Sequence, residues 1–260
     1  MKQAELFELY LPYPGKDDRR VRVYVPAHGE GEELPVIYMT DGQNLFDEET
    51  STWGCWHTRE AVEAERAASG KAAIIVGIHN DNIWRDNELT PASIGEPVTA
   101  ADMANYTASE GEIFDSFVMD TVKPYIESHF PVKLGRENTA FCGSSSGGLQ
   151  AFFTALSHPE AFTISGVFSP AFLLYSPDDI RRWISDVLTD EPPYLYIYTG
   201  AGDELEQRIF AGTEATCDVL TEIYPPELFS EIILLENKHN EAAWAEVFPD
   251  FLHTFLNREK

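Results

Sequence analysis

Three consecutive serines lie midway along the chain, in the stretch FCGSSSGGLQAF that spans residues 141–152. The pattern Gly-x-Ser-x-Gly fits only one register here, with Gly143 and Gly147 at its ends and Ser145 at its centre. In a nucleophile elbow, this pattern holds the serine on a sharp strand-to-helix turn where larger neighbouring side chains would collide. The pattern favours Ser145 as an attacking group in acyl transfer. A turn that merely joins a strand to a helix is the alternative.

A serine hydroxyl is a weak nucleophile near neutral pH, so this chemistry also needs a base. His239 is the best candidate among the seven histidines, because it follows the apolar run 229–236 and precedes the last helical stretch. Enzymes with a nucleophile elbow carry their catalytic residues in the chain order serine, acid, histidine. Four histidines precede Ser145, His158 comes too soon after it, and His253 lies within the last expected helix.

The acid of such a site binds the far ring nitrogen of the histidine, fixes its tautomer and stabilises the imidazolium. It should follow the strand that precedes the last one. The stretch YLYIYTGAGDE, residues 194–204, carries two acids just beyond that expected strand. We favour Asp203, which is closer to the strand end, over Glu204, which we expect to begin a helix.

An oxyanion intermediate needs two backbone N–H donors aimed at the developing negative charge. Ser146, which follows the candidate nucleophile, supplies one. The other should come from the loop DGQNLF, residues 41–46, where Gly42 lets the backbone turn inward and Gln43 offers its N–H. An ordinary Asp-Gly turn explains the same loop equally well.

The elements that must position these residues follow from the apolar pattern. Two alternating runs predict an antiparallel hairpin at 5–11 and 20–26. Six short apolar runs predict strands that are buried on both faces, at 34–41, 72–79, 139–143, 162–169, 194–200 and 229–236. Helical stretches separate them, at 58–68, 113–129, 148–157, 177–188, 205–223 and 240–257. This alternation predicts an α/β fold with a mostly parallel central sheet of about eight strands and helices on both faces.

The chain of 260 residues shows no repeat or flexible linker, so we expect a single domain over 1–260. The segment 87–112 breaks the alternation of strands and helices, with two prolines, two glycines and many small polar residues. Long irregular insertions in compact domains are usually functional. We therefore expect a lid or pocket wall there.

Composition excludes several classes of partner. Only 18 Lys and Arg residues face 44 Asp and Glu residues, which gives a net charge of −26. Nucleic acid and anionic membrane surfaces are therefore poor partners. The acids are spread along the chain rather than clustered as cation ligands, so no metal site is expected. The sequence leaves the oligomeric state open, a homodimer included.

The location is predicted from what the chain lacks. The first ten residues carry acids and no apolar segment of the secretory kind, and no apolar run reaches 18 residues. Three widely spaced cysteines, Cys55, Cys142 and Cys217, fit reduced thiols. Together these features predict a cytoplasmic protein.

Several stretches resemble the bacterial putative-esterase family of α/β-hydrolases, which includes esterase D, feruloyl and enterochelin esterases and the mycolyltransferase antigens. The similar motifs are VIYMTDGQNLFD, GIHNDNIWRDNELTP, FCGSSSGGLQAFFTALSHPEAF, VFSPAF, YIYTGAGDE and KHNEAAW. The resemblance covers nearly the whole chain and implies an α/β-hydrolase fold. It is specific to the family and not to a substrate.

The resemblance implies the same roles by position: Ser145 as nucleophile, Asp203 as acid, His239 as base, and Gln43 and Ser146 as oxyanion donors. Two positions depart from the pattern. Ser146 stands where many relatives carry Met, which should matter little because the backbone N–H is used. Aspartate at position 41 replaces the histidine of some branches and is closer to the enterochelin-esterase and mycolyltransferase branches.

Three tryptophans, Trp53, Trp56 and Trp84, flank loops at the expected carboxyl ends of the strands, where this fold binds ligands. Each alone is more often a packing residue. As a group they suggest an aromatic wall for an acyl or sugar group.

The sequence as a whole predicts a serine carboxylesterase that acts on a small-molecule ester through an acyl-enzyme, with no metal or organic cofactor. Two alternatives stay open. The same residues can pass the acyl group to an alcohol or sugar, which would make the protein an acyltransferase. A non-catalytic binding module on a hydrolase fold is the second, although such modules usually lose a catalytic residue.

Overall fold

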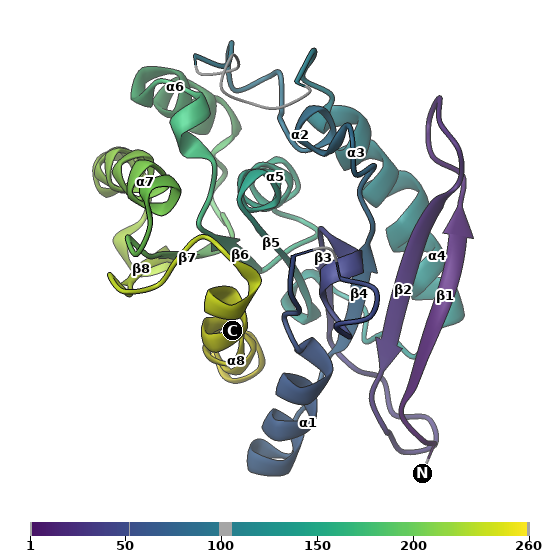
Figure 1. Cartoon of the computed structure of the whole chain (residues 1–260). Helices are drawn as coiled ribbons and strands as arrows, with labels where there is room; N and C mark the ends of the chain where they lie inside the picture. Colours follow the sequence, from purple (N-terminus) through teal and green to yellow (C-terminus); the bar gives the residue numbers. More distant parts are fainter. Residues whose placement is uncertain (1, 52, 99–105, 259–260) are drawn as a thin grey trace. The chain divides into compact units, whose positions relative to one another are not determined.

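A computed structural model describes residues 2–51, 53–98 and 106–258 of the chain (Figure 1). Its strands are β1 (Glu5–Leu11), β2 (Arg19–Val25), β3 (Val36–Met39), β4 (Ile74–Ile78), β5 (Thr139–Ser144), β6 (Ile164–Phe168), β7 (Tyr194–Thr199) and β8 (Phe229–Ile233). They are ordered β1-β2-β4-β3-β5-β6-β7-β8 in an eight-stranded sheet. β3 pairs with β4, β6 with β7 and β7 with β8 in parallel, while β1 and β2 pair antiparallel. This confirms the predicted hairpin and the mostly parallel sheet.

The helices are α1 (Thr58–Ser69), α2 (Arg85–Glu88), α3 (Gly111–Phe117), α4 (Lys123–His129), α5 (Ser146–Ser157), α6 (Pro177–Val187), α7 (Glu204–Ile223) and α8 (Glu241–Asn257). The stretch predicted as one helix over 113–129 is α3 and α4 joined by one wider turn, η3 (Val118–Val122). No helix among the described residues is long and apolar enough to cross a membrane.

The chain divides into two compact units, each described by itself. The first comprises Met1–Asn80, Ser116–Ala140 and Asn240–Lys260, and the second comprises Asp81–Asp115 and Phe141–His239. The expectation of a single domain stays a prediction. Ser145 and His239 both belong to the second unit, so the contacts within that unit decide how they are positioned.

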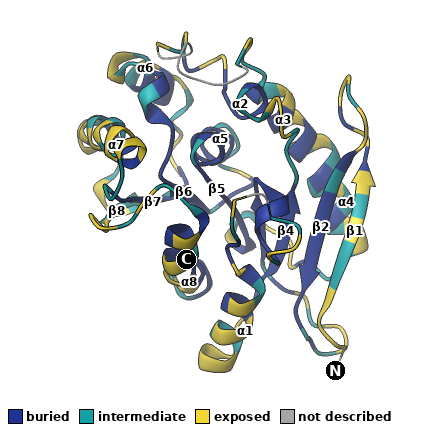
Figure 2. Ribbon diagram, viewed as in Figure 1, coloured by how far each residue is buried: buried dark blue, intermediate teal, exposed yellow. Residues whose placement is uncertain are grey.

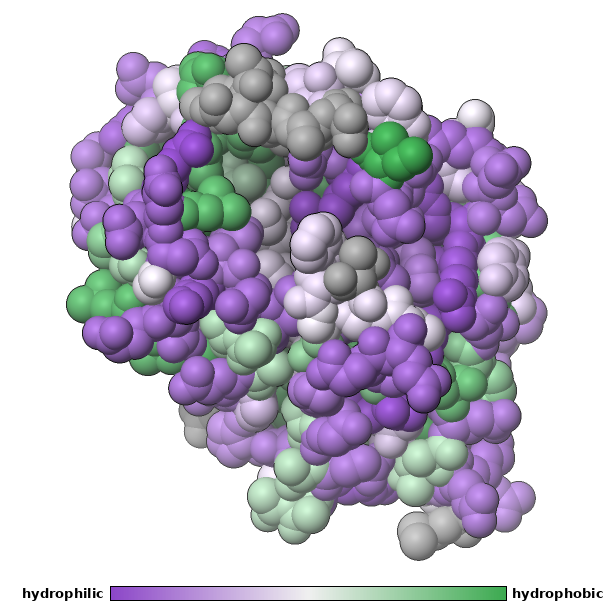
Figure 3. All heavy atoms as spheres, in the orientation of Figure 1, coloured by the Kyte–Doolittle hydropathy of each residue, from purple (hydrophilic) through white to green (hydrophobic). Residues whose placement is uncertain are grey.

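The burial of a strand depends on its position in the sheet (Figure 2). β4 and β6 are buried along their whole length, as predicted for strands covered on both faces. Every residue of β8 is at least partly accessible. The reason is that β8 is the last strand in the order and has a neighbour on one side only. The run at 229–236 was predicted to be doubly buried, and that prediction is wrong. Polar residues cover most of the face in Figure 3, in keeping with the high net charge.

The helices of the second unit enclose an apolar core between α5, α6 and α7. Phe152 packs edge-on against Phe172 with ring centroids 4.9 Å apart, and Phe153 stacks on Trp183 at 5.2 Å. Burying large rings in this way removes much apolar area from water. This packing fixes the position of α5, the helix that follows the serine motif.

The 87–112 segment is described on either side of residues 99–105, and both described parts are anchored to the second unit. Ile94 is fully buried in the same core, and the N–H of Val98 donates to the carbonyl of Leu174 over 2.7 Å. The Asn87 side chain bonds both the backbone N–H and the hydroxyl of Thr107, at 2.9 Å each. Residues 99–105 lie outside the described residues. The lid or pocket wall at 87–112 stays a prediction.

One ion pair of the second unit predicts a pH-dependent stability. His158, which follows α5, lies with Nε2 2.7 Å from a carboxylate oxygen of Asp115 on α3. The hydrogen bond that the His158 ring donates to Asp115 raises the pKa of His158 above its usual 6.5, and the nearby charges of Asp115 and Glu160 reinforce this against the opposing effect of burial. A raised folded-state pKa contributes stability that is complete below the unfolded pKa and is lost as the pH rises through the folded one.

We therefore expect His158→Gln to lower the free energy of unfolding most at pH values below 6.5. The difference from the parent protein should shrink as the pH rises above the raised pKa. Urea unfolding at a series of pH values measures this, with His129→Gln as the control, because His129 is exposed and its ring bonds the carbonyl of Tyr125 and the hydroxyl of Ser128 instead of a carboxylate. A difference that stays constant from pH 5.5 to pH 9 would contradict the assignment.

Candidate active site

Ser145 lies on a strained turn between β5 and α5. Its backbone has φ 59° and ψ −126°, a region that non-glycine residues rarely occupy. Its N–H donates to the carbonyl of Phe168 over 3.0 Å, and its own carbonyl accepts from the N–H of Ala171 over 3.0 Å. Strain of this kind persists where the surrounding structure over-determines the backbone, and it is characteristic of functional sites. The turn is the geometry expected of a nucleophile elbow.

A glycine outside the pentapeptide also allows this turn. A Cβ on Gly148 would lie 2.6 Å from the carbonyl oxygen of Phe168. A side chain there would push α5 away from the end of β6. The role of Gly148 could not be predicted from the sequence, because it depends on a close approach between the start of α5 and the last residue of β6, which lie 20 residues apart.

The short helix α2 bonds both neighbours of Ser145. The Arg85 guanidinium donates to the carbonyl of Ser144 over 3.2 Å, and the Ser146 hydroxyl donates to the Asp86 carboxylate over 3.0 Å. Ser146 is also the first residue of α5, where backbone N–H groups have no partner within the helix. Its N–H is therefore suited to receive negative charge.

The ring of His239 is held by a carboxylate that was not predicted from the sequence, Glu206. Nδ1 of His239 lies 2.5 Å from Oε2 of Glu206, whose side chain is fully buried. Asp203 contacts the same histidine elsewhere: its Oδ2 accepts the backbone N–H of His239 over 3.0 Å. The prediction that Asp203 partners the imidazole is therefore wrong.

The reason is the helix that follows. Asp203 is the N-cap of α7, and its Oδ1 accepts the N–H of Glu206 over 2.8 Å. Both oxygens of this short side chain thus bind backbone N–H groups, and these bonds outweigh burial and lower the pKa of Asp203. Glu204 begins α7, as predicted.

Glu206 is surrounded by hydrogen-bond donors. Its Oε1 accepts from the Ser169 hydroxyl at 2.6 Å, the Gly200 N–H at 2.8 Å and the Thr199 hydroxyl at 3.3 Å. Burial alone would raise the pKa of Glu206, but the hydrogen bonds from His239, Ser169 and Gly200 outweigh it, so the pKa is lowered. The carboxylate is therefore ionised near neutral pH, which is the form that can stabilise a protonated imidazole.

One sequence signal could have drawn attention to Glu206. Asp203 and Glu206 have the D-x-x-E spacing of a capping box, in which the N-cap side chain bonds the N3 backbone. In that motif the glutamate reaches back to the N-cap backbone. Here it reaches further, to Gly200 and to His239. The spacing indicates only a helix cap, so sequence reasoning could not tell the two roles apart.

The second backbone donor predicted for the oxyanion, Gln43, belongs to the first unit. Gln43 lies in the turn η1 (Gly42–Asn44) and is 8% exposed. A Cβ on Gly42 would overlap the backbone of Gly77, so glycine is needed for this turn to approach β4. The role of Gln43 as a donor stays a prediction.

The three tryptophans do not share one environment. Trp56 is 2% exposed and packs against Trp244, with ring centroids 5.7 Å apart, so it serves the core and not a ligand surface. Trp53, in the first unit, is 78% exposed, and Trp84, at the start of α2 in the second unit, is 39% exposed. Substrate contact by Trp53 and Trp84 stays a prediction.

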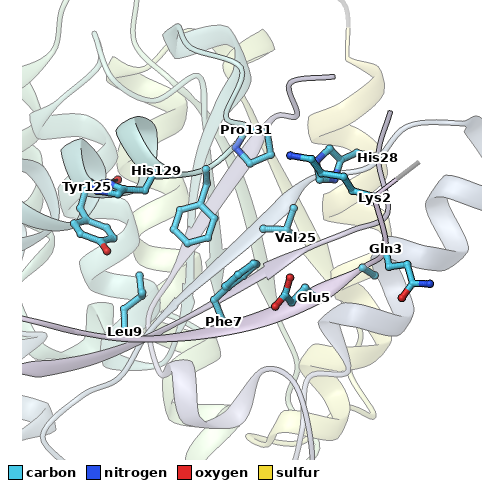
Figure 4. Close-up of a pocket in the computed structure, with 12 residues that line it drawn as sticks. Lys2, Gln3, Glu5, Phe7, Leu9, Val25, His28, Tyr125, His129 and Pro131 are labelled. Carbon is cyan, nitrogen blue, oxygen red and sulfur yellow. Dashed lines mark hydrogen bonds between the residues drawn. The ribbon is translucent and has the colours of Figure 1, made fainter. Parts of the chain in front are cut away.

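A pocket of about 860 Å³ lies along β1 in the first unit (Figure 4). Apolar side chains and two histidines line it, among them Phe7, Leu9, Val25, His28 and His129. No serine or cysteine is among its lining residues, so it does not offer a nucleophile of the kind predicted at Ser145. No group of three or more potential metal ligands occurs in the part of the chain that the structure describes.

Two curated proteins are similar to the chain. An endo-1,4-beta-xylanase/feruloyl esterase of Xylanibacter ruminicola is 27% identical over 197 residues, which cover 70% of this chain and 22% of that protein. An iron(III) salmochelin esterase of Escherichia coli is 23% identical over 230 residues, which cover 78% of this chain and 49% of that protein. The chain thus spans about a fifth and about half of the length of these relatives.

Among solved structures, an IroE-like serine hydrolase from Shewanella oneidensis superposes with a TM-score of 0.72 at 19% identity, covering 97% of this chain and 80% of that one. At this identity the likeness supports the α/β-hydrolase fold. The family model described as putative esterase matches residues 15–211. A match over most of the chain, with the serine motif inside it, means that the protein belongs to this esterase family.

Proposed function

We propose that the protein is a serine carboxylesterase whose catalytic residues are Ser145, His239 and Glu206. The observation that carries the proposal is a strained serine at a strand–helix turn, in the same compact unit as a histidine whose ring is held by a buried carboxylate. Membership of the esterase family supports the reaction class.

In the proposed reaction, Ser145 attacks the ester carbonyl while Nε2 of His239 takes the hydroxyl proton. Glu206 accepts a hydrogen bond from Nδ1–H, which fixes the tautomer and stabilises the imidazolium. The N–H of Ser146, at the start of α5, binds the oxyanion. The tetrahedral intermediate then expels the alcohol, which receives the proton from His239. Water, activated by the same histidine, hydrolyses the acyl-enzyme and restores Ser145.

The names of the relatives and the net charge of the chain limit the range of candidate substrates. The relatives are named as a feruloyl esterase and as a salmochelin esterase, so feruloyl esters and siderophore esters are the first substrates to test. The net charge of −26 disfavours strongly anionic substrates, because the summed field repels them. Added alcohols or sugars, tested in competition with water, would distinguish hydrolysis from acyl transfer.

We expect Ser145→Ala to abolish both ester hydrolysis and labelling by a fluorophosphonate probe. Removal of a nucleophile of this kind costs several orders of magnitude in rate. Ser144→Ala is the matched control and should keep most activity, because its carbonyl, and not its hydroxyl, contacts Arg85. Turnover of p-nitrophenyl acetate by purified protein is the measurement. Near-normal turnover by Ser145→Ala would disprove the assignment, and an unlabelled but folded parent protein would favour a non-catalytic module.

We expect Glu206→Gln to lower kcat by about 10³-fold to 10⁴-fold, because the amide fixes the wrong tautomer and removes the balancing charge. Asp203→Asn should cost at least tenfold less, because it disturbs only backbone contacts. Glu204→Gln, on the exposed start of α7, is the control and should change little. Steady-state kinetics on one ester compare all three variants. If Asp203→Asn is the most damaging, Asp203 is the acid after all.

A further inference from the structure

Ser169, directly after β6, has an unusual backbone. Its φ is 40°, and it is one of the few non-glycine residues with positive φ among the described residues. Its side chain is fully buried. Glycine, asparagine or aspartate adopt such a conformation more readily than serine does. A strained serine at this position therefore suggests that the hydroxyl itself is used.

The turn at Ser169 contacts the segments that hold Ser145 and Glu206. Its N–H donates to the carbonyl of Tyr198 on β7 over 2.6 Å, and its hydroxyl donates to Oε1 of Glu206 over 2.6 Å. Phe168, directly before it, accepts from the N–H of Ser145, and Ala171, two residues after it, donates to the carbonyl of Ser145. One short turn thus contacts both the backbone of the nucleophile and the side chain of the acid.

We infer that Ser169 is a positioning residue for Glu206, an inference that rests on the function proposed above. The Ser169 hydroxyl and the Gly200 N–H both donate to Oε1 of Glu206. The other oxygen, Oε2, is thereby directed at the ring of His239. The left-handed turn at Ser169 keeps this carboxylate in register with the backbone of Ser145. The hydroxyl contacts no reacting atom, so its effect on turnover passes through Glu206 and His239.

Loss of the hydroxyl should leave a signature in the pH profile. Two charged groups of this unit contact the histidine, Glu206 at its ring and Asp203 at its backbone N–H. When the imidazole is neutral, the carboxylate depends on its hydroxyl and amide donors. When the imidazole is protonated, it stabilises the carboxylate as well. Removal of the hydroxyl therefore penalises the deprotonated pair more, and the acid limb of activity moves to higher pH.

The experiment compares Ser169→Ala and Ser169→Gly with Ser165→Ala in the whole protein. Ser165 is an equally buried serine on β6 whose hydroxyl donates to the carbonyl of Ala151 over 2.8 Å, so it controls for the loss of a buried hydroxyl. Ser169→Gly relieves the backbone strain, which keeps the test valid if the alanine variant folds poorly.

With p-nitrophenyl acetate, both Ser169 variants should lose about tenfold to a hundredfold in kcat, the range found when groups that orient metal-ligating side chains are removed. KM should change little, and the acid limb of kcat/KM should move to higher pH. Ser165→Ala should stay within about twofold of the parent.

Each remaining outcome bears on a different claim. Parent-like kcat and pH profile in Ser169→Gly would overturn the inference, because that variant lacks the hydroxyl. Unfolding of both Ser169 variants, seen by circular dichroism, would assign the residue to folding and overturn it as well. Failure of the proposed function looks different: the parent protein would not react with a fluorophosphonate, or Ser145→Ala would still hydrolyse the ester.

Discussion

The second unit is organised around one buried carboxylate. An ionised carboxylate away from water is strongly disfavoured unless donors surround it, and an unsatisfied one takes up a proton. Glu206 meets this requirement with a hydroxyl from the end of β6, an amide from the end of β7 and a ring nitrogen from the loop after β8. The ends of three strands and the first turn of α7 must therefore converge on two oxygen atoms. The placement of the histidine follows from this constraint.

Convergence at this density leaves no room for side chains at two positions. A Cβ on Gly200 would overlap the carbonyl of Asn237, and one on Gly202 would overlap that of Glu236. The Gly202 N–H donates to the carbonyl of Asn237 over 2.7 Å, two residues before the histidine. The Gly-Ala-Gly stretch after β7 thus has a steric cause, since it allows the histidine loop to lie directly on the start of α7.

These contacts also explain how far sequence reasoning could reach. Ser145 and His239 could be proposed because their positions follow from chain order and from where strands end, which apolar runs reveal. The acid could not, because the distinction between Asp203 and Glu206 depends on side-chain length and on which donors a helix start consumes. Trp56 was misjudged for a similar reason: a tryptophan after a loop looks the same in sequence whether it faces a ligand or packs on Trp244.

Strain at the site is shared between neighbouring strands. Ser145 after β5 and Ser169 after β6 both have positive φ, and their segments are bonded through both backbone groups of Ser145. Neither turn would keep its conformation alone, because each is unfavourable for serine. Held together, and supported by the apolar core behind α5, they keep the proposed nucleophile and the donor to its proposed acid in one rigid arrangement. The family motif accounts for the first turn. The second follows from the requirement of a buried glutamate for a donor.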